Sequence, residues 1–240
     1  MMPLPLNRRL AAAFITAALS SFVATVPTAA AAATSEFSAA EQALFVDKHL
    51  RALKPPVTLR YAFRKAGSLE EPFSDSVDIK LTAQADGTCC ASSARFLTDA
   101  REVPQPQIEG AQGNPAILYF LERDIREMER LTKGKANYFR KRIRMAVFQA
   151  ATIRKVQLPY KSRSVEVREI SITPYEDDPN RSRYEKLTNK RYVFQLSSDV
   201  PGGLYGINTR IAGESPEAPP LMFEQMTIEG AEPTPPARKP

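Results

Sequence analysis

The spacing of apolar residues changes along the chain and predicts strands, then helices, then strands again. Residues 57–63 and 77–83 alternate apolar and polar side chains, as half-buried antiparallel strands do. A third strand is expected over residues 89–97, after the hairpin signal Asp86-Gly87. The alternation returns later in the chain, in segments 153–158, 165–173, 192–196, 204–211 and 221–228.

Between the two groups of strands, residues 115–149 carry the helical period. Their apolar side chains recur every three to four positions, which predicts amphipathic helices. Asn114-Pro115 suits the cap and first turn of a helix, and Lys133-Gly134-Lys135 interrupts the period. We therefore expect a helical hairpin over this segment.

One more helix is expected near the N-terminus, over residues 38–54. Ser38 and Glu41 have the spacing of a capping box, and Pro55-Pro56 would end the helix. Together, the patterns predict an α+β fold. It consists of a curved antiparallel sheet or incomplete β-barrel of about eight strands, with an N-terminal helix and an inserted helical hairpin.

The first 33 residues have the organisation of a secretory signal peptide. Arg8-Arg9 precede an apolar run, and Ala31-x-Ala33 offers a cleavage site near Ala33. An uncleaved membrane anchor is the alternative, because the apolar run approaches the length of a bilayer span. We expect a periplasmic or secreted protein, with residues 34–229 as a single domain and residues 230–240 as a disordered, proline-rich tail.

The charge pattern favours one local basic surface over a general affinity for polyanions. Cleavage removes Arg8-Arg9 and no acid, so the formal charge falls from +6 to +4. No acidic residue lies between Glu129 and Glu166, however. On the second hairpin helix, Arg140, Lys141 and Arg144 are candidates for contact with an anionic membrane surface or another envelope polyanion. The alternative is a solvated face neutralised by Glu122 and Glu127, and no nucleic-acid partner is expected.

The sequence carries no recognisable catalytic constellation, and we expect neither enzymatic activity nor a cofactor or metal. His49 is the single histidine and lacks the sequence context of a catalytic base, so we expect it on the surface or in a groove. The adjacent Cys89 and Cys90 would point to opposite faces of a strand, which favours two buried thiols. A vicinal disulfide or intermolecular pairing are the alternatives.

The order of elements over residues 57–229 resembles the LolA/LolB-like half-barrels of Gram-negative cell envelopes. The stretches Phe120-Leu-Glu-Arg-Asp-Ile-Arg-Glu-Met and Pro201-Gly-Gly-Leu-Tyr are also similar to those of uncharacterised proteobacterial periplasmic proteins. The resemblance implies a hydrophobic or lipid-like ligand, carried in an apolar cavity without chemistry. Inward-facing residues would line that cavity, although a solid core would use the same set: Leu59, Tyr61, Phe63, Ile79 and Leu81.

Three functions are therefore compared. The leading prediction is a periplasmic, non-enzymatic binding protein for a lipid-like or hydrophobic ligand. The first alternative is an assembly or scaffold protein of the cell envelope that acts on a protein partner through the charged hairpin 115–149, and an exposed Phe or Leu patch beside the hairpin would favour it. The second alternative is a carboxylate-dependent hydrolase, which requires a cleft with two facing acids.

Overall fold

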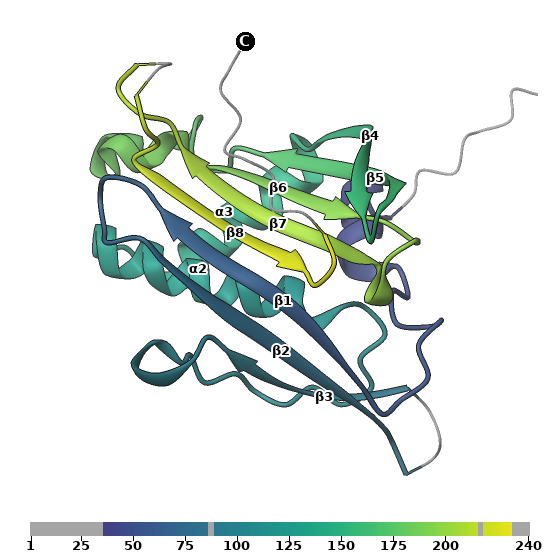
Figure 1. Ribbon diagram of the computed structural model, residues 1–240. Helices are drawn as coiled ribbons and strands as arrows, with labels where there is room; N and C mark the ends of the chain where they lie inside the picture. The colour runs from purple at the N-terminus through teal and green to yellow at the C-terminus, as the bar shows by residue number, and fades with distance from the viewer. Residues whose placement is uncertain (1–35, 86–88, 216–217, 232–240) are drawn as a thin grey trace, which may run out of the picture. The chain divides into compact units, whose positions relative to one another are not determined.

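The alternating segments form the strands of one open antiparallel sheet, in the order β3-β2-β1-β8-β7-β6-β5-β4 (Figure 1). This confirms the predicted α+β class. The strands are β1 (Val57–Ala66), β2 (Phe73–Ala83), β3 (Cys89–Phe96), β4 (Thr152–Tyr160), β5 (Arg163–Ile172), β6 (Arg191–Leu196), β7 (Leu204–Ile211) and β8 (Met222–Ile228).

The computed structural model describes residues 36–85, 89–215 and 218–231. All of them belong to the unit Ser35–Pro240. The expected signal peptide, the Asp86-Gly87 turn and most of the expected proline-rich tail lie outside the described residues.

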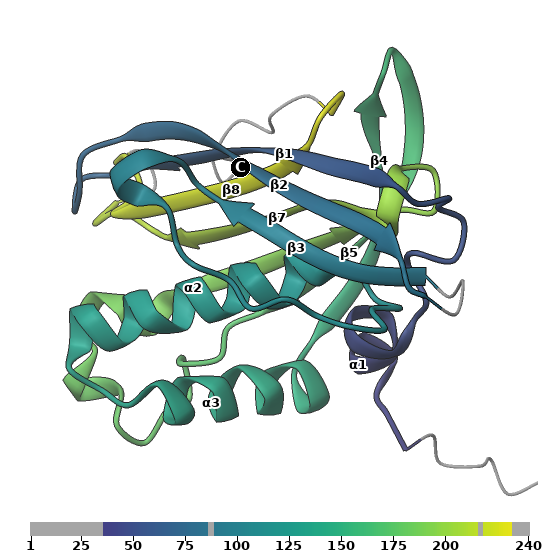
Figure 2. The same cartoon turned by 90° about the horizontal axis from the view of Figure 1, so that it is seen from below.

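The predicted helical hairpin consists of α2 (Pro115–Thr132) and α3 (Ala136–Gln149). Asn114 caps α2, because its side-chain oxygen accepts a hydrogen bond from the N–H of Ala116 at 3.0 Å. α2 lies against one face of the sheet, and α3 lies on the far side of α2 (Figure 2). Among the described residues, no helix is long and apolar enough to cross a membrane.

The N-terminal helix is shorter than the sequence predicts. The capping box is present in α1 (Ala39–Glu41), because Ser38 N–H donates to the Glu41 carboxylate and Glu41 N–H donates to Ser38 Oγ. A single π-helical segment, Gln42–Val46, follows, and the helix ends there. Beyond it, the N–H of Leu50 donates to the carbonyl of Gln112 at 3.0 Å, so a tertiary contact replaces the helical hydrogen bond.

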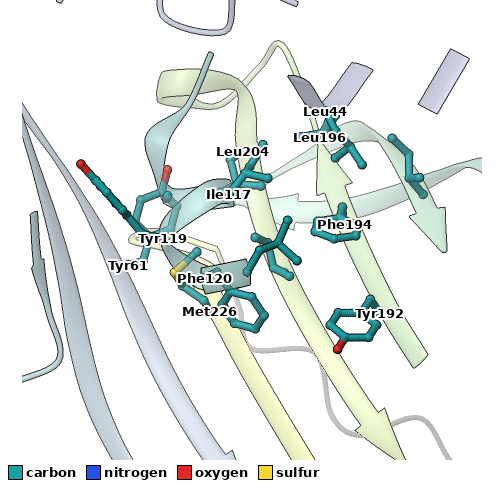
Figure 3. Close-up of a cluster of buried hydrophobic side chains, with 14 of the residues drawn as sticks. Leu44, Tyr61, Ile117, Tyr119, Phe120, Tyr192, Phe194, Leu196, Leu204 and Met226 are labelled. Carbon is teal, nitrogen blue, oxygen red and sulfur yellow. The ribbon is translucent and has the colours of Figure 1, made fainter. Parts of the chain in front are cut away.

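The core lies between the sheet and α2. Six inward apolar side chains of β1 and β2 are each at most 2% exposed, as the alternation predicts: Leu59, Tyr61, Phe63, Val77, Ile79 and Leu81. Figure 3 shows Ile117 and Phe120 of α2 among side chains of the central strands, including Phe194, Leu204 and Met226. Burial of such large apolar side chains, at about 1.5–3 kcal/mol each, is the main force that holds the helix to the sheet.

The cysteines differ from the favoured expectation, because Cys89 and Cys90 form a disulfide. The alternation of side chains along a strand argued for two thiols on opposite faces. In the structure the two side chains are instead joined to each other. The vicinal bridge, one of the alternatives, is the arrangement in the structure.

Candidate functional site

A groove of about 1230 Å³ opens where three segments that are distant in sequence meet. The N-terminal wall consists of residues 42–53. The hairpin wall is formed by Lys155 of β4 with Glu166 and Arg168 of β5. The turn wall consists of residues 196–203, which connect β6 to β7. The β4–β5 hairpin projects to the side of the sheet opposite α2 and α3 (Figure 2).

The lining of the groove combines an apolar strip with charges. Val46 and Leu53 of the N-terminal wall, together with Leu196 and Val200 of the turn wall, supply the strip. Val46 is 39% exposed, whereas Leu196 and Val200 are 4% and 5% exposed. The apolar surface open to a ligand therefore lies mainly on the N-terminal wall.

Four of the charges that line the groove already form two ion pairs, one between the N-terminal and hairpin walls and one within the hairpin wall. Arg168 lies 3.3 Å from Asp47, and Lys155 lies 3.0 Å from Glu166. Lys48 and Arg51 are exposed and form no ion pair within the part of the chain that the structure describes. These two cations are available to an anionic ligand group.

His49 lies at the junction of the walls and has both ring nitrogens engaged. Nδ1 accepts a hydrogen bond from the backbone N–H of Asn114 at 3.1 Å, and Nε2 lies 2.9 Å from the carbonyl oxygen of Ala43. A backbone N–H can only donate and a carbonyl can only accept, so the ring is neutral and carries its proton on Nε2. Burial lowers the pKa of His49, although the Ala43 hydrogen bond and Asp47 act in the opposite direction.

Asn114 extends this connection into the core and to the turn wall. Its side-chain nitrogen donates to the hydroxyl of Tyr61 and to the carbonyl of Gly202, both at 2.8 Å. Gly202 has φ +70, and a Cβ atom there would lie 2.5 Å from the side chain of Leu59. We call His49 and Asn114, with their partners Ala43, Tyr61 and Gly202, the His49–Asn114 clamp.

A second polar centre lies between α2 and the sheet, and the sequence analysis missed it. Lys65 of β1 lies 3.0 Å from Glu127 of α2 and 3.5 Å from Glu224 of β8. Arg123 donates to the same carboxylate of Glu224 at 3.0 Å. Burial alone would lower the pKa of Lys65, but its carboxylate neighbours raise it, so the ammonium stays charged.

Asp124 continues this centre toward β6. Its carboxylate accepts hydrogen bonds from Lys190 and, at 2.6 Å, from the hydroxyl of Tyr192. Asp124, Lys190 and Tyr192 are fully buried, so a substrate cannot reach them and their role is structural. We call Lys65, Arg123, Asp124, Glu127, Lys190 and Glu224 the buried ion cluster.

The predicted ligand-contacting residues of β1 and β2 do not line the groove. Leu59, Tyr61, Phe63, Ile79 and Leu81 all belong to the packed core. Leu59 and Tyr61 still influence the groove indirectly, since they contact Gly202 and Asn114 of the clamp. A ligand cavity built from these five residues stays a prediction.

The predicted basic surface of α3 is partly neutralised. Arg140 donates two hydrogen bonds to Glu122 of α2, at 2.8 and 2.7 Å, and this pairing lowers the pKa of Glu122. Lys141 and Arg144 are exposed. Glu127, the other expected neutralising acid, instead belongs to the buried ion cluster. Contact with an anionic surface therefore stays a prediction that depends on Lys141 and Arg144.

The structure offers no group of three or more His, Cys, Asp or Glu side chains placed to hold a metal ion, within residues 36–85, 89–215 and 218–231. No known protein family and no curated protein matches the chain. The resemblance to LolA/LolB-like proteins, and the signal peptide with the location that it implies, stay predictions.

Proposed function

We propose that the protein is a non-enzymatic binding protein of the periplasm, and that its ligand is an elongated, anionic amphiphile. The observation that carries this proposal is the composition of the groove. Its apolar strip, in which Val46 is exposed, lies beside the free cations Lys48 and Arg51. A ligand with an apolar chain and an anionic end matches both features.

Two energetic contributions support this ligand class. An apolar chain laid against Val46 and Leu53 would lose its contact with water, which is worth about 25 cal/mol per Å² of buried surface. Lys48 and Arg51 are exposed, so each would add at most about 1 kcal/mol for an anionic group. The chain would therefore supply most of the affinity, and the charged end would set the orientation.

A dansyl-labelled undecane sulfonate tests the proposal, because its sulfonate stays ionised at every pH used. We expect saturable one-to-one binding by a rise in dansyl fluorescence. The double variant Lys48→Gln/Arg51→Gln should bind about tenfold more weakly at low salt, as expected for a loss of about 1.4 kcal/mol. Because exposed charges are screened, the difference should shrink at high ionic strength.

The matched control is Arg64→Gln/Lys80→Gln, which removes two exposed cations from β1 and β2 outside the groove. This variant should keep the wild-type affinity. The uncharged dansyl undecanol should bind more weakly than the sulfonate to the wild type. Absence of saturable binding, or equal losses in both double variants, would remove the proposal.

The scaffold function is retained as a second candidate because each hairpin helix exposes a large apolar side chain. Leu118 of α2 is 48% exposed and Phe148 of α3 is 52% exposed. If the hairpin docks on an envelope protein, a photo-crosslinking residue at either position should give discrete adducts in cells. The same residue at Lys80 should give none.

A hydrolase is less well supported by the groove. Asp47 and Glu166 line the groove, but both are held in ion pairs. Asp47 pairs with Arg168 of the hairpin wall, and Glu166 pairs with Lys155 of its own wall. A general acid or base needs a carboxyl group that is free to exchange its proton with a substrate. The geometry therefore favours binding over hydrolysis.

A further inference from the structure

The His49–Asn114 clamp joins the N-terminal wall and the turn wall of the groove to the cap of α2 through one imidazole ring. Nε2 of His49 bonds to Ala43, at the start of the N-terminal wall, and Nδ1 bonds to the cap of α2. A Cβ atom at Gly203 would lie only 3.2 Å from Cβ of His49, so the turn wall lies directly against this side chain. The ring is the contact point of segments that are far apart in sequence.

Protonation of His49 would change one of these bonds specifically. In the imidazolium both ring nitrogens carry hydrogen and can only donate. Nε2–H can still donate to Ala43, but Nδ1–H would face the backbone N–H of Asn114, which is also a donor. The hydrogen bond between the N-terminal wall and the cap of α2 is then lost, while the bond to Ala43 is kept.

The charges around the imidazole ring influence the pH at which His49 is protonated. On the segment that carries His49, Asp47 favours the imidazolium. Lys48 and Arg51 of the same segment are positively charged. Arg168 of β5 opposes protonation, and the Lys155–Glu166 pair and Asp199 line the same groove. α2 contributes the uncharged Asn114 and β1 the Tyr61 hydroxyl, and residues 201–203 carry no titratable side chain.

We infer that the His49–Asn114 clamp is a pH-operated latch, closed by the neutral imidazole and released by its protonation, which frees the N-terminal wall from Asn114. Release loosens the groove at the junction of its walls. The direction follows from the exchange of an acceptor for a donor at Nδ1. The inference concerns the protein without a bound ligand, and its test needs no ligand. It is therefore independent of the proposed function.

The single histidine makes the test direct, because an untagged protein gives one set of imidazole signals. Long-range 1H–15N spectra should show the Nε2–H tautomer at pH 8 and protonation with a midpoint below 6.5. The backbone amide of Asn114 should shift with the same midpoint. Its hydrogen exchange, corrected for intrinsic pH dependence, should be at least tenfold faster in the protonated state.

Three variants sharpen the test. His49→Gln keeps an acceptor and a donor but cannot titrate, so the Asn114 amide should stay protected at acidic pH. Asp47→Asn should move the His49 midpoint to lower pH, and Arg168→Gln should move it to higher pH, because these charges act on the ring in opposite directions.

The wild-type titration stands even if a variant fails to fold. The latch is disproved if the ring carries its proton on Nδ1 at pH 8. It is also disproved if Asn114 exchange is unchanged when His49 becomes charged.

Discussion

Two polar centres of this protein, the His49–Asn114 clamp and the buried ion cluster, are built on opposite principles. The His49–Asn114 clamp uses neutral groups at the edge of a groove, where one partner can take up a proton. The buried ion cluster uses full charges in the interior, each next to an opposite charge. Removing charges from water is costly unless pairing compensates, so the cluster has one stable arrangement. The clamp has two, and the comparison separates a fixed part of the fold from a responsive one.

Breaking the ion cluster should give the largest effect. In Asp124→Leu, Lys190 would remain fully buried without its carboxylate partner, and the Tyr192 hydroxyl would lose its acceptor. Such an uncompensated buried charge costs about 3–5 kcal/mol. We expect a loss of this size in the free energy of unfolding, measured in urea by circular dichroism, which suits a chain without tryptophan.

The double variant Asp124→Leu/Lys190→Met is the control, because it removes both charges of the pair. It should recover most of the stability lost in the single variant, since the penalty comes from the unpaired ammonium. Equal destabilisation of the two variants would mean that packing around Asp124, rather than charge, explains the loss.

Breaking the clamp at Asn114 should have a smaller effect. Asn114→Ala removes the cap of α2 and the donor to Tyr61 and Gly202. Loss of a helix cap costs about 1 kcal/mol, and an unsatisfied buried acceptor costs about 1–3 kcal/mol. We expect a total loss of about 2–3 kcal/mol in urea unfolding.

Asn114→Ser separates the two contributions, because serine restores a capping oxygen but not the side-chain amide. It should recover about 1 kcal/mol relative to Asn114→Ala. A serine variant as unstable as the alanine variant would show that the cap contributes little here.

The smallest expected effect is on the pH dependence of stability, which should differ between the two centres. The pKa of His49 is lower in the folded than in the unfolded protein, so its contribution is present above pH 6.5 and is lost as the pH falls. Burial by itself would raise the pKa of Glu127, but Arg130 and Lys65 lower it to about 2. The contribution of Glu127 is therefore nearly constant from pH 8 to 5 and is lost as the pH falls from 4.5 to about 2.

Urea unfolding at several pH values between 8 and 5 measures this difference. The wild type should lose stability relative to His49→Gln as the pH falls below 6.5. Parallel curves for the two proteins would show that His49 does not titrate differently in the folded state.

The sequence predicted the fold well because most elements carry their own periodic signal. The strands and the helical hairpin were located because burial of one face imposes a period of two or of about 3.6 on the side chains. The predicted N-terminal helix was longer than the observed one. Leu50 forms a hydrogen bond with Gln112 instead of a helical partner, and no local pattern reveals this contact. The cysteine pairing was kept only as an alternative, because the alternation of side chains along a strand argued for thiols on opposite faces.

The site was less predictable, since its parts come together only through the fold. His49 was expected on the surface or in a groove, but its partner Asn114 was identified only as a helix cap. The buried ion cluster did leave a signal in the pattern. Lys65 continues the inward alternation of Tyr61 and Phe63, and Asp124 lies within the apolar stripe of α2. A charge at an inward position is a reason to expect a buried ion pair.

The position of β8 has a consequence for how the chain is synthesised. Among the described residues, β8 is the last strand in sequence, yet it lies in the middle of the sheet, between β1 and β7. The strands β1–β3 and β4–β7 meet within the sheet only through it, so the central pairings cannot form until residues 222–228 have left the ribosome. Pairings between such distant residues also form slowly. The two groups of strands therefore stay unjoined in the nascent chain until that point of its synthesis.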